Sequence, residues 1–396
     1  MNTIMECERI YGAQNYEPLP VVLVKGEGVY VWDDAGNRYI DMMSAYSAVS
    51  HGHCHPKLVK ALQDQAHQLC VVSRSFYTDK LAHFLKRVCE MTGFEKALPM
   101  NTGAEAVETA LKAARKWAYT AKGVANDKAE VIACEGNFHG RTIAIVGLSS
   151  ESQYRAGFGP FPAGLKRVPY GDAKALEAAI TPNTAAFLVE PIQGEGGIIV
   201  PKEGYLKACA AICKKHNVLL ICDEIQTGLG RTGKLLACQH EGVRPDAVVL
   251  GKALGGGLLP VSMFLTRADV MDVFTPGDHG STFGGNPLAA VVGHAALEVL
   301  EEEKLSERAA TLGAYFMQQL KAIQSPCIKE VRGCGLLIGL EIDAAYPAHA
   351  ICLNLLPLGI LTKETHKTVI RFAPPLVITE EQIDEVIQAI KKVLPA

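Results

Sequence analysis

Two short apolar runs, each ending near a charged residue, most constrain how this chain can fold. Residues 218–222 (VLLIC) lead directly to Asp223, and residues 247–250 (AVVL) lead to Gly251 and Lys252. Runs of this length and β-branched content are typical of strands buried on both faces of a parallel sheet. In an open α/β sheet, ligands bind beyond the carboxyl ends of the strands. The pattern therefore places a carboxylate and an amine where a ligand binds.

A carboxylate and an amine delivered in this way suit one cofactor. Pyridoxal phosphate needs a lysine that forms a Schiff base and an acid that keeps its pyridine nitrogen protonated. Lys252 lies between an apolar strand and a glycine run, with few charges nearby. Desolvation in such a place lowers the pKa of an amine and makes it a better nucleophile. The plainer interpretation, a solvated loop lysine, fits this setting less well, so we favour a cofactor site.

The start of a predicted helix near Thr102, earlier in the chain, has the features of an anion-binding site. Residues 97–100 (ALPM) resemble a short strand, and Thr102 followed by Glu105 fits a capping box. Apolar positions then keep to one helical face through Trp117. Free backbone N–H groups and the helix dipole attract anions at such a start. The signal is weak alone, but beside a cofactor site it predicts where the phosphate binds.

Strand and helix patterns alternate along the rest of the chain. Strands at 131–134 and 185–190 and a helix at 204–216 are typical of a doubly wound parallel sheet. Residues 21–43 instead alternate as an antiparallel meander, with a first turn at 25–28 (KGEG). We therefore predict an α/β fold with a mostly parallel sheet, in three parts: an N-terminal segment with antiparallel strands (1–45), a large cofactor-binding domain (46–287), and a connecting helix with a smaller α+β domain (288–396).

Composition excludes several classes of function. The net charge of −3 provides no basic field for nucleic acid or an anionic membrane. No apolar run approaches the roughly 18 residues of a spanning helix, and the N-terminus has no targeting features, so we expect a cytoplasmic protein. The glycine-rich loops of nicotinamide and nucleotide enzymes are missing. The twelve cysteines include no CxxC pair, and the histidines of residues 51–55 (HGHCH) are too close together for one metal, so no metal site is expected.

Six motifs, in one order, resemble a known family. They read NTGAEAVETALKAAR, NFHGRT, VEPIQGEGG, DEIQTGLGRTGK, LGKALGGG and HGSTFGGNPL. Together they are similar to class III (ω-) aminotransferases of fold type I, over nearly the whole chain. Within that family, GAQNYEPLPVVLVKGEGVYVWD, SAYSAVSHGHCHP and RFAPPLVI are similar to the ornithine δ-aminotransferases. The resemblance implies a pyridoxal 5'-phosphate enzyme that forms a homodimer or a larger homo-oligomer, with active sites at the interface.

The resemblance also implies which residues contact the cofactor. Lys252 would carry the Schiff base and shuttle a proton, Asp223 would pair with the pyridine nitrogen, and Gln226 with the ring hydroxyl. Gly103 and Ala104 would donate backbone N–H groups to the phosphate. The other implied contacts are Phe138 stacked on the ring, His139, Ser281, and Thr282, which would reach the phosphate of the neighbouring subunit.

The substrate contacts follow from the same matches. Tyr16 and Arg141 would hold the α-carboxylate of ornithine, and Tyr46 would shape the pocket. Arg371 would bind the α-carboxylate of glutamate, while Glu195 would mask this arginine when ornithine is bound. The expected reaction is a ping-pong transfer of the δ-amine of ornithine to 2-oxoglutarate. Its product cyclises to pyrroline-5-carboxylate, which implies a role in proline biosynthesis or arginine catabolism.

The chain departs from the ornithine pattern at one position. His139 stands where ornithine enzymes often carry tryptophan, and histidine is usual in acetylornithine and 4-aminobutyrate enzymes. An acetylornithine or 4-aminobutyrate aminotransferase is therefore the first alternative. An aminomutase, which returns the amine to the same carbon skeleton, is the second alternative, and a catalytically silent relative is the third.

Overall fold

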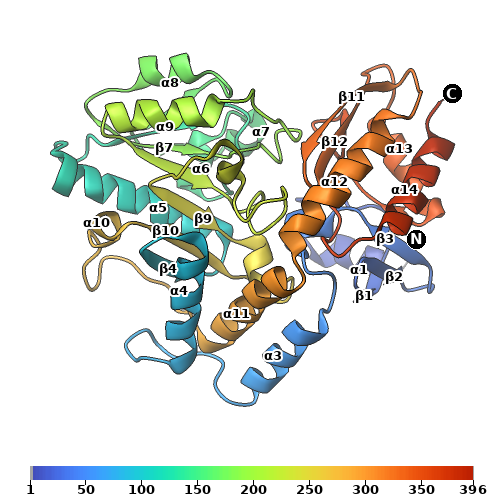
Figure 1. The fold of residues 1–396 in the computed structure, drawn as a ribbon, viewed down its shortest axis with the longest axis horizontal. Coiled ribbons are helices and arrows are strands. Elements are labelled where there is room, and N and C mark those ends of the chain that lie inside the picture. Colours follow the sequence, from blue (N-terminus) through green and yellow to red (C-terminus); the bar gives the residue numbers. More distant parts are fainter. Residues whose placement is uncertain (1–2, 396) are drawn as a thin grey trace.

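A seven-stranded sheet is the largest element of the computed structural model, which describes residues 3–395 (Figure 1). Its strands are β4 (Lys96–Met100), β5 (Glu130–Cys134), β6 (Leu165–Val168), β7 (Thr184–Val189), β8 (Leu219–Asp223), β9 (Ala247–Leu250) and β10 (Ser262–Thr266). Their spatial order is β4-β10-β9-β8-β7-β5-β6. The strands from β6 to β9 pair in parallel, whereas β10 is antiparallel to both of its neighbours. The α/β prediction is confirmed, with one reversed strand that the apolar pattern did not indicate.

The central strands are covered on both faces. Ile221 of β8 lies in the core that includes α5 (Gly103–Trp117), whereas Cys222 lies in the opposite core with α9 (Tyr205–Lys215) and α11 (Pro287–Glu302). Full burial of one large aliphatic side chain stabilises a fold by about 1.5–3 kcal/mol. Because both faces are buried, these strands read as continuous apolar runs without polar alternation.

The helices begin where the sequence offers caps. The N–H of Glu105 donates to the Thr102 hydroxyl, and the Glu105 carboxylate accepts the N–H of Thr102, so the predicted capping box forms. The remaining helices outside the C-terminal region are α1 (Thr3–Tyr11), α3 (Pro56–Ala66), α4 (Asp79–Thr92), α6 (Ile143–Leu148), α7 (Ser152–Arg155), α8 (Ala173–Ala179) and α10 (Ala268–Met271). Shorter helical turns are α2 (Ser44–Ser47), η1 (Ala118–Lys122), η2 (Ala237–Glu241), η3 (Lys252–Gly255) and η4 (Leu356–Leu358).

A second, four-stranded sheet contains the C-terminal strands, on the right of Figure 1. Its order is β11-β12-β15-β14, and all of its pairs are antiparallel. Residues of this C-terminal sheet and of the seven-stranded sheet belong to one continuous core cluster, which also includes residues of α11 and α12. The elements of this part are β11 (Ile328–Cys334), β12 (Leu337–Ile342), β14 (Glu364–Thr365), β15 (Val369–Phe372), α12 (Leu305–Lys321), α13 (Ala348–Leu355) and α14 (Glu380–Val393).

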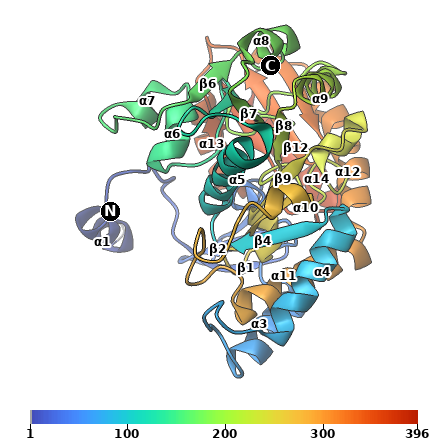
Figure 2. The same ribbon diagram turned by 90° about the vertical axis from the view of Figure 1, so that its left-hand side faces the viewer.

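The N-terminal meander forms a third sheet. Strands β1 (Leu23–Glu27), β2 (Tyr30–Asp33) and β3 (Arg38–Asp41) are antiparallel, and β13 (Ile360–Leu361) adds to β3 in parallel. The predicted turn at 25–28 is wrong, because β1 continues through Glu27 while it pairs with β2. Helix α1 has no buried residue and projects to the left in Figure 2.

The histidines at 51–55 contact three different partners. His51 bonds to the carbonyl oxygen of Ala296, whereas His53 bonds to Asp41 and His55 to Glu303. Within residues 3–395, no group of three or more His, Cys, Asp or Glu residues could hold a metal ion. No helix in the same range has the length and apolar character needed to cross a membrane.

We predict that Gly313→Ala destabilises the fold by about 1–3 kcal/mol, the usual range for overpacking, although alanine is the better helix former. A Cβ on Gly313, in the middle of α12, would lie 2.1 Å from the carbonyl oxygen of Gly335. Because the added Cβ is fixed to the backbone of α12 and the oxygen belongs to the backbone of Gly335, α12 would have to move. The midpoint of thermal unfolding measures the loss. Ala314→Leu, on the exposed next position, is the control and should change stability by less than about 0.5 kcal/mol. Equal losses would contradict this packing argument.

Candidate active site

The carboxyl ends of the central strands open into a pocket of about 190 Å³. Asp223 is the last residue of β8, and Lys252 follows β9 after one glycine. Because these strands are parallel neighbours, the two residues reach the same edge of the sheet. The pocket is lined by Gly103, Ala104, Phe138, His139, Gly140, Glu190, Ile192, Glu195, Asp223, Ile225, Gln226, Thr227 and Lys252.

Lys252 combines a strained backbone with a desolvated amine. Its φ of 44° lies in the left-handed region, which a side-chain-bearing residue adopts at a cost of roughly 1–3 kcal/mol. Burial lowers the pKa of its amine, and the charges of Glu195 and Asp223 partly oppose this shift. A lowered pKa leaves more of the neutral amine, which is the nucleophilic form.

An imidazole and two carboxylates lie together on one side of the pocket. Nδ1 of His139 is 2.7 Å from Oδ2 of Asp223, and both side chains are almost fully buried. Burial opposes protonation of His139, but the hydrogen bond and charge of Asp223 raise its pKa. Glu190 accepts the N–H of Phe138 at 3.0 Å, and burial raises the pKa of this carboxyl to about 7. Glu190 was not predicted, although it follows a buried strand as Asp223 ends one.

The start of α5 provides two unpaired donors. The capping box occupies the N–H groups of Thr102 and Glu105, and Ala106 donates to the carbonyl oxygen of Thr102 at 3.2 Å. In the part of the chain that the structure describes, the N–H groups of Gly103 and Ala104 have no acceptor, and both residues line the pocket. This arrangement suits a phosphate group.

Glu195 and Arg371 form a two-fold ion pair. Nη1 of Arg371 is 2.6 Å from Oε1 of Glu195, and Nη2 is 3.0 Å from Oε2. Burial by itself raises the pKa of Glu195, but the charge and hydrogen bonds of Arg371 lower it to about 2. Gln226 also donates to Glu195 at 3.1 Å, and Tyr46 lies against Arg371 with 5.0 Å from the guanidinium carbon to the ring centroid. The structure thus shows Arg371 covered by Glu195.

Arg141 lies against two aromatic rings that contact each other edge to face. Its guanidinium carbon is 3.9 Å from the ring centroid of Tyr154 and 5.4 Å from that of Phe138. Phe138 lines the pocket, whereas Arg141 is not among the residues that line it, and Tyr154 is a neighbour that the sequence did not indicate. Tyr16 is 71% exposed but lies close enough to Tyr46 to contribute to the raised pKa of that phenol, behind the larger effects of burial and nearby charges.

A left-handed turn, α2, holds Tyr46. All four of its residues have φ between 40° and 76°, which costs roughly 1–2 kcal/mol per residue. Asp41 stabilises the turn by accepting the N–H of Ser44 at 2.9 Å. The fully buried Arg231 donates to the Ser44 hydroxyl at 3.1 Å. Neither residue was predicted; the contact of Arg231 joins segments far apart in the sequence, whereas that of Asp41 spans only three positions.

Two residues expected near the cofactor lie outside the pocket. Ser281 accepts a hydrogen bond from Asn101 at 2.8 Å, and Thr282 is exposed. Both line a separate hollow that includes residues 71–75. A cofactor role for Thr282 therefore requires a neighbouring subunit.

The unsatisfied groups of the pocket match one cofactor. Pyridoxal phosphate carries a phosphate for Gly103 and Ala104, and a ring hydroxyl for Oε1 of Gln226, which is buried without a partner. It also carries a basic ring nitrogen for Asp223 and an aldehyde for Lys252. This site at the ends of a mostly parallel sheet defines the class: a fold type I, pyridoxal-phosphate-dependent transferase.

Comparison with known proteins narrows the class to a family. Residues 11–394 match the family Aminotransferase class-III, and the chain belongs to it. An ornithine aminotransferase of Geobacillus sp. (strain WCH70) is 59% identical over 383 residues, covering 97% of this chain and 96% of the relative. An ornithine aminotransferase of Bacillus subtilis (strain 168) is 59% identical over 384 residues, covering 97% and 95%.

Solved structures agree with this family. A crystal structure of the ornithine aminotransferase from Toxoplasma gondii ME49 is 49% identical, with a TM-score of 0.97, and covers 98% of this chain and 94% of that chain. An acetylornithine aminotransferase from Elizabethkingia anophelis is 50% identical, with a TM-score of 0.90, and covers 99% and 98%. The predicted family and fold are confirmed, and the chain is a pyridoxal-phosphate-dependent aminotransferase.

We predict that Asp223→Asn lowers kcat by about one to three powers of ten and changes cofactor affinity only modestly. The amide keeps the shape of the side chain but loses the negative charge that favours a protonated ring nitrogen. One nearby opposite charge shifts a pKa by about one to three units, and the protonated fraction changes by the same number of powers of ten. Steady-state rates and a cofactor titration by absorbance measure the two effects. Asp272→Asn, on an exposed carboxylate, is the control. An unchanged kcat would mean that another group pairs with the nitrogen.

Proposed function

We propose that this chain is an ornithine δ-aminotransferase. It transfers the δ-amino group of L-ornithine to 2-oxoglutarate and forms glutamate 5-semialdehyde and glutamate. The semialdehyde then cyclises to pyrroline-5-carboxylate. Curated relatives at 59% identity carry this activity in their names. The structural observation that carries the proposal is the ion pair between Glu195 and Arg371.

This ion pair controls which amine can react. An uncovered Arg371 would bind the α-carboxylate of any amino acid and bring its α-amine to Lys252. With Glu195 in place, the guanidinium is neutralised, and a bidentate pair of this kind is a strong contact. The ornithine carboxylate is then left to Tyr16 and Arg141, farther from Lys252. The δ-amine therefore faces Lys252, whereas glutamate displaces Glu195 and presents its α-amine.

The pocket residues then perform the chemistry around the cofactor. Bound pyridoxal phosphate supplies an electron sink for the bonds of the carbon that carries the reacting amine. Nζ of Lys252 moves a proton at that carbon, and its lowered pKa leaves more of the amine in the neutral form that can accept a proton near neutral pH. Asp223 keeps the ring nitrogen protonated, and His139 orients Asp223. Gly103 and Ala104 hold the phosphate.

A second copy of the chain completes the proposed site. Several large apolar side chains near Thr282 are exposed to solvent. Monomeric proteins rarely expose a contiguous apolar surface, whereas an interface with another subunit would bury it. They are Leu69 (45%), Val71 (40%), Phe76 (66%), Tyr77 (106%) and Phe283 (56%). A partner that covers this face would bring its own Thr282 towards the phosphate. We therefore propose a homodimer or larger homo-oligomer, active in the cytoplasm in the metabolism of proline or arginine.

An acetylornithine aminotransferase is the second candidate. A solved enzyme with that name is 50% identical and covers 99% of this chain. His139 also favours it, because histidine at this position is a feature shared with acetylornithine enzymes. The two activities differ in whether the α-amine of the donor is free or acetylated.

A panel of amine donors tests the proposal. Ornithine, N-acetylornithine and 4-aminobutyrate are each supplied with 2-oxoglutarate, and glutamate and pyrroline-5-carboxylate are measured, with Lys252→Ala as the blank. We expect the largest kcat/KM with ornithine, and pyrroline-5-carboxylate in that reaction alone. Faster turnover of N-acetylornithine would favour the second candidate. Conversion of a donor to an isomeric amine without an oxo acid would indicate an aminomutase.

We predict that Tyr16→Phe lowers kcat/KM for ornithine by roughly tenfold to a hundredfold and leaves glutamate nearly unchanged. A hydrogen bond to a charged group contributes about 1.5–3 kcal/mol. Tyr11→Phe, on an exposed tyrosine of α1, is the matched control. Equal losses for both substrates would show that Tyr16 supports the pocket without binding the ornithine carboxylate.

We predict that Glu195→Ala changes the two half-reactions in opposite directions, by about one to two powers of ten. Glutamate should react faster, because it no longer competes with Glu195 for Arg371. Ornithine should react more slowly at its δ-amine, and some α-transamination should appear. Single-turnover absorbance with each amino acid measures both rates, and Glu203→Ala, on an exposed carboxylate, is the control. Similar changes in the same direction would exclude the switch.

A further inference from the structure

We propose that Thr365 and Arg332 are positioning residues, which hold the loop of Glu195 against the C-terminal sheet and thereby help to select ornithine over glutamate. The inference rests on the proposed function, because it concerns how Glu195 is kept opposite Arg371. Neither residue lines the pocket.

The loop that carries Glu195 is rich in glycine, and its internal hydrogen bonds, from the N–H groups of Gly197 and Ile198 to the carbonyl oxygen of Gly194, do not involve Glu195 itself. Glycines occupy positions 194, 196 and 197 around Glu195, and Gly197 has φ of 108°. Glycine gives a chain more conformational freedom than any other residue. The base of the loop is closed by a bridge between Gln193 and Ile199. The position of Glu195 at the tip therefore depends on contacts from outside the loop.

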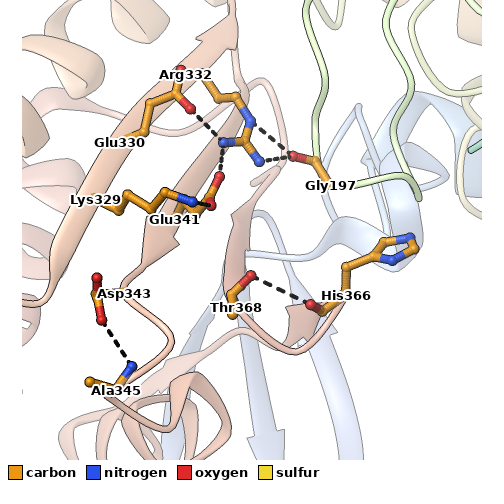
Figure 3. A network of polar contacts seen from close by, with 9 residues as sticks. All are labelled: Gly197, Lys329, Glu330, Arg332, Glu341, Asp343, Ala345, His366 and Thr368. Carbon is orange, nitrogen blue, oxygen red and sulfur yellow. Dashed lines mark hydrogen bonds and ion pairs between the residues drawn. The ribbon is translucent and has the colours of Figure 1, made fainter. Parts of the chain in front are cut away.

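The C-terminal sheet supplies these contacts. The Thr365 hydroxyl, on β14, donates to the main-chain oxygen of Glu195 at 2.9 Å. From β11, Nη2 of Arg332 donates to the carbonyl oxygen of Gly197 at 2.7 Å, and its Nε lies 3.1 Å from the carbonyl oxygens of both Gly197 and Ile198. Figure 3 shows the guanidinium of Arg332 directed at Gly197. Two strands thus hold one short loop.

Two carboxylates fix the direction of this guanidinium. Nη1 of Arg332 is 2.8 Å from Glu330 and also forms an ion pair with Glu341, on the side away from the loop (Figure 3). The Arg332 side chain is only 12% exposed. Hydrogen bonds from a charged donor are stronger than those between neutral groups. Arg332 is therefore built to hold the carbonyl groups of the loop.

Apolar packing strengthens the same attachment. Ile198 is fully buried, with a φ of 54°, in a cluster with Ile192, Leu337 and Ala373. The cluster places the loop on β12, and Arg371 is on β15, the strand that pairs with β12. The C-terminal sheet thus holds both partners of the ion pair. Glu195 can then release Arg371 by rotating its side chain while its backbone stays in place.

The first experiment compares Thr365, on β14, with Thr368, in the turn between β14 and β15. Thr365→Val removes the hydroxyl that holds Glu195, whereas Thr368→Val removes one whose sole hydrogen bond among the described residues is to the nearby His366 oxygen at 3.5 Å. Single-turnover rates with ornithine and with glutamate are measured for both variants. Thr365→Val should lower the ornithine-to-glutamate rate ratio by about twofold to tenfold, the worth of one neutral hydrogen bond. Thr368→Val should leave the ratio unchanged.

The second experiment addresses Arg332. Arg332→Met removes the donors to Gly197 and Ile198, and Arg244→Met is the control, because it removes an arginine donor to a different main-chain oxygen, that of Gly93. Amide hydrogen exchange of residues 194–199, read in protein without substrate, should be faster in Arg332→Met and Thr365→Val than in their controls. This measurement does not depend on catalysis.

Three results would overturn the inference. They are an unchanged rate ratio in Thr365→Val, an equal slowing of both half-reactions, and unchanged exchange of the loop in both test variants. The failure of the proposed function would look different, because the wild-type enzyme itself would then not produce pyrroline-5-carboxylate from ornithine.

Discussion

The parallel pairing of β8 and β9 is the constraint on which the rest of the active site depends. It brings Asp223 and Lys252 to one edge of the sheet, although a long loop with one short helical turn, η2, and strand β9 separate them in the chain. The pairing is stable only because apolar helices bury both faces of these strands. The two cores therefore do more than stabilise the fold, since they determine where the amine and the carboxylate meet.

Burial of charge shapes the chemistry of this edge. An unpaired buried charge is costly, so each ionised group of the pocket requires a partner. Asp223 has His139, and Glu195 has Arg371, whereas the amine of Lys252 has no hydrogen-bonded carboxylate among the described contacts. Its pKa falls accordingly, while the pKa of Glu195 drops to about 2. The same low-dielectric pocket thus makes one group reactive and another a stable anion.

In the function that we propose, substrate choice depends on a different part of the molecule. The cofactor groups belong to the seven-stranded sheet, whereas Arg371 and the contacts that hold the Glu195 loop belong to the C-terminal sheet. Helices α11 and α12 contribute to a core that both sheets share, so the two parts are packed together. The seven-stranded sheet can then hold the catalytic groups in place, while the C-terminal sheet determines which substrate carboxylate is bound. This division of roles follows from one ion pair, between Glu195 and Arg371, which joins the two parts.

Features encoded within a few neighbouring residues could be predicted from the sequence. Apolar runs predicted β8 and β9 with the charges at their ends, and Thr102 with Glu105 predicted the start of α5, because burial and capping leave signals within a few residues. Six ordered motifs identified the family. The reversed direction of β10 and the pairing of β13 with β3 depend on long-range packing and left no local signal. The contacts of Arg231, Glu190 and Thr365 were likewise invisible, since their partners lie on distant segments and depend on packing.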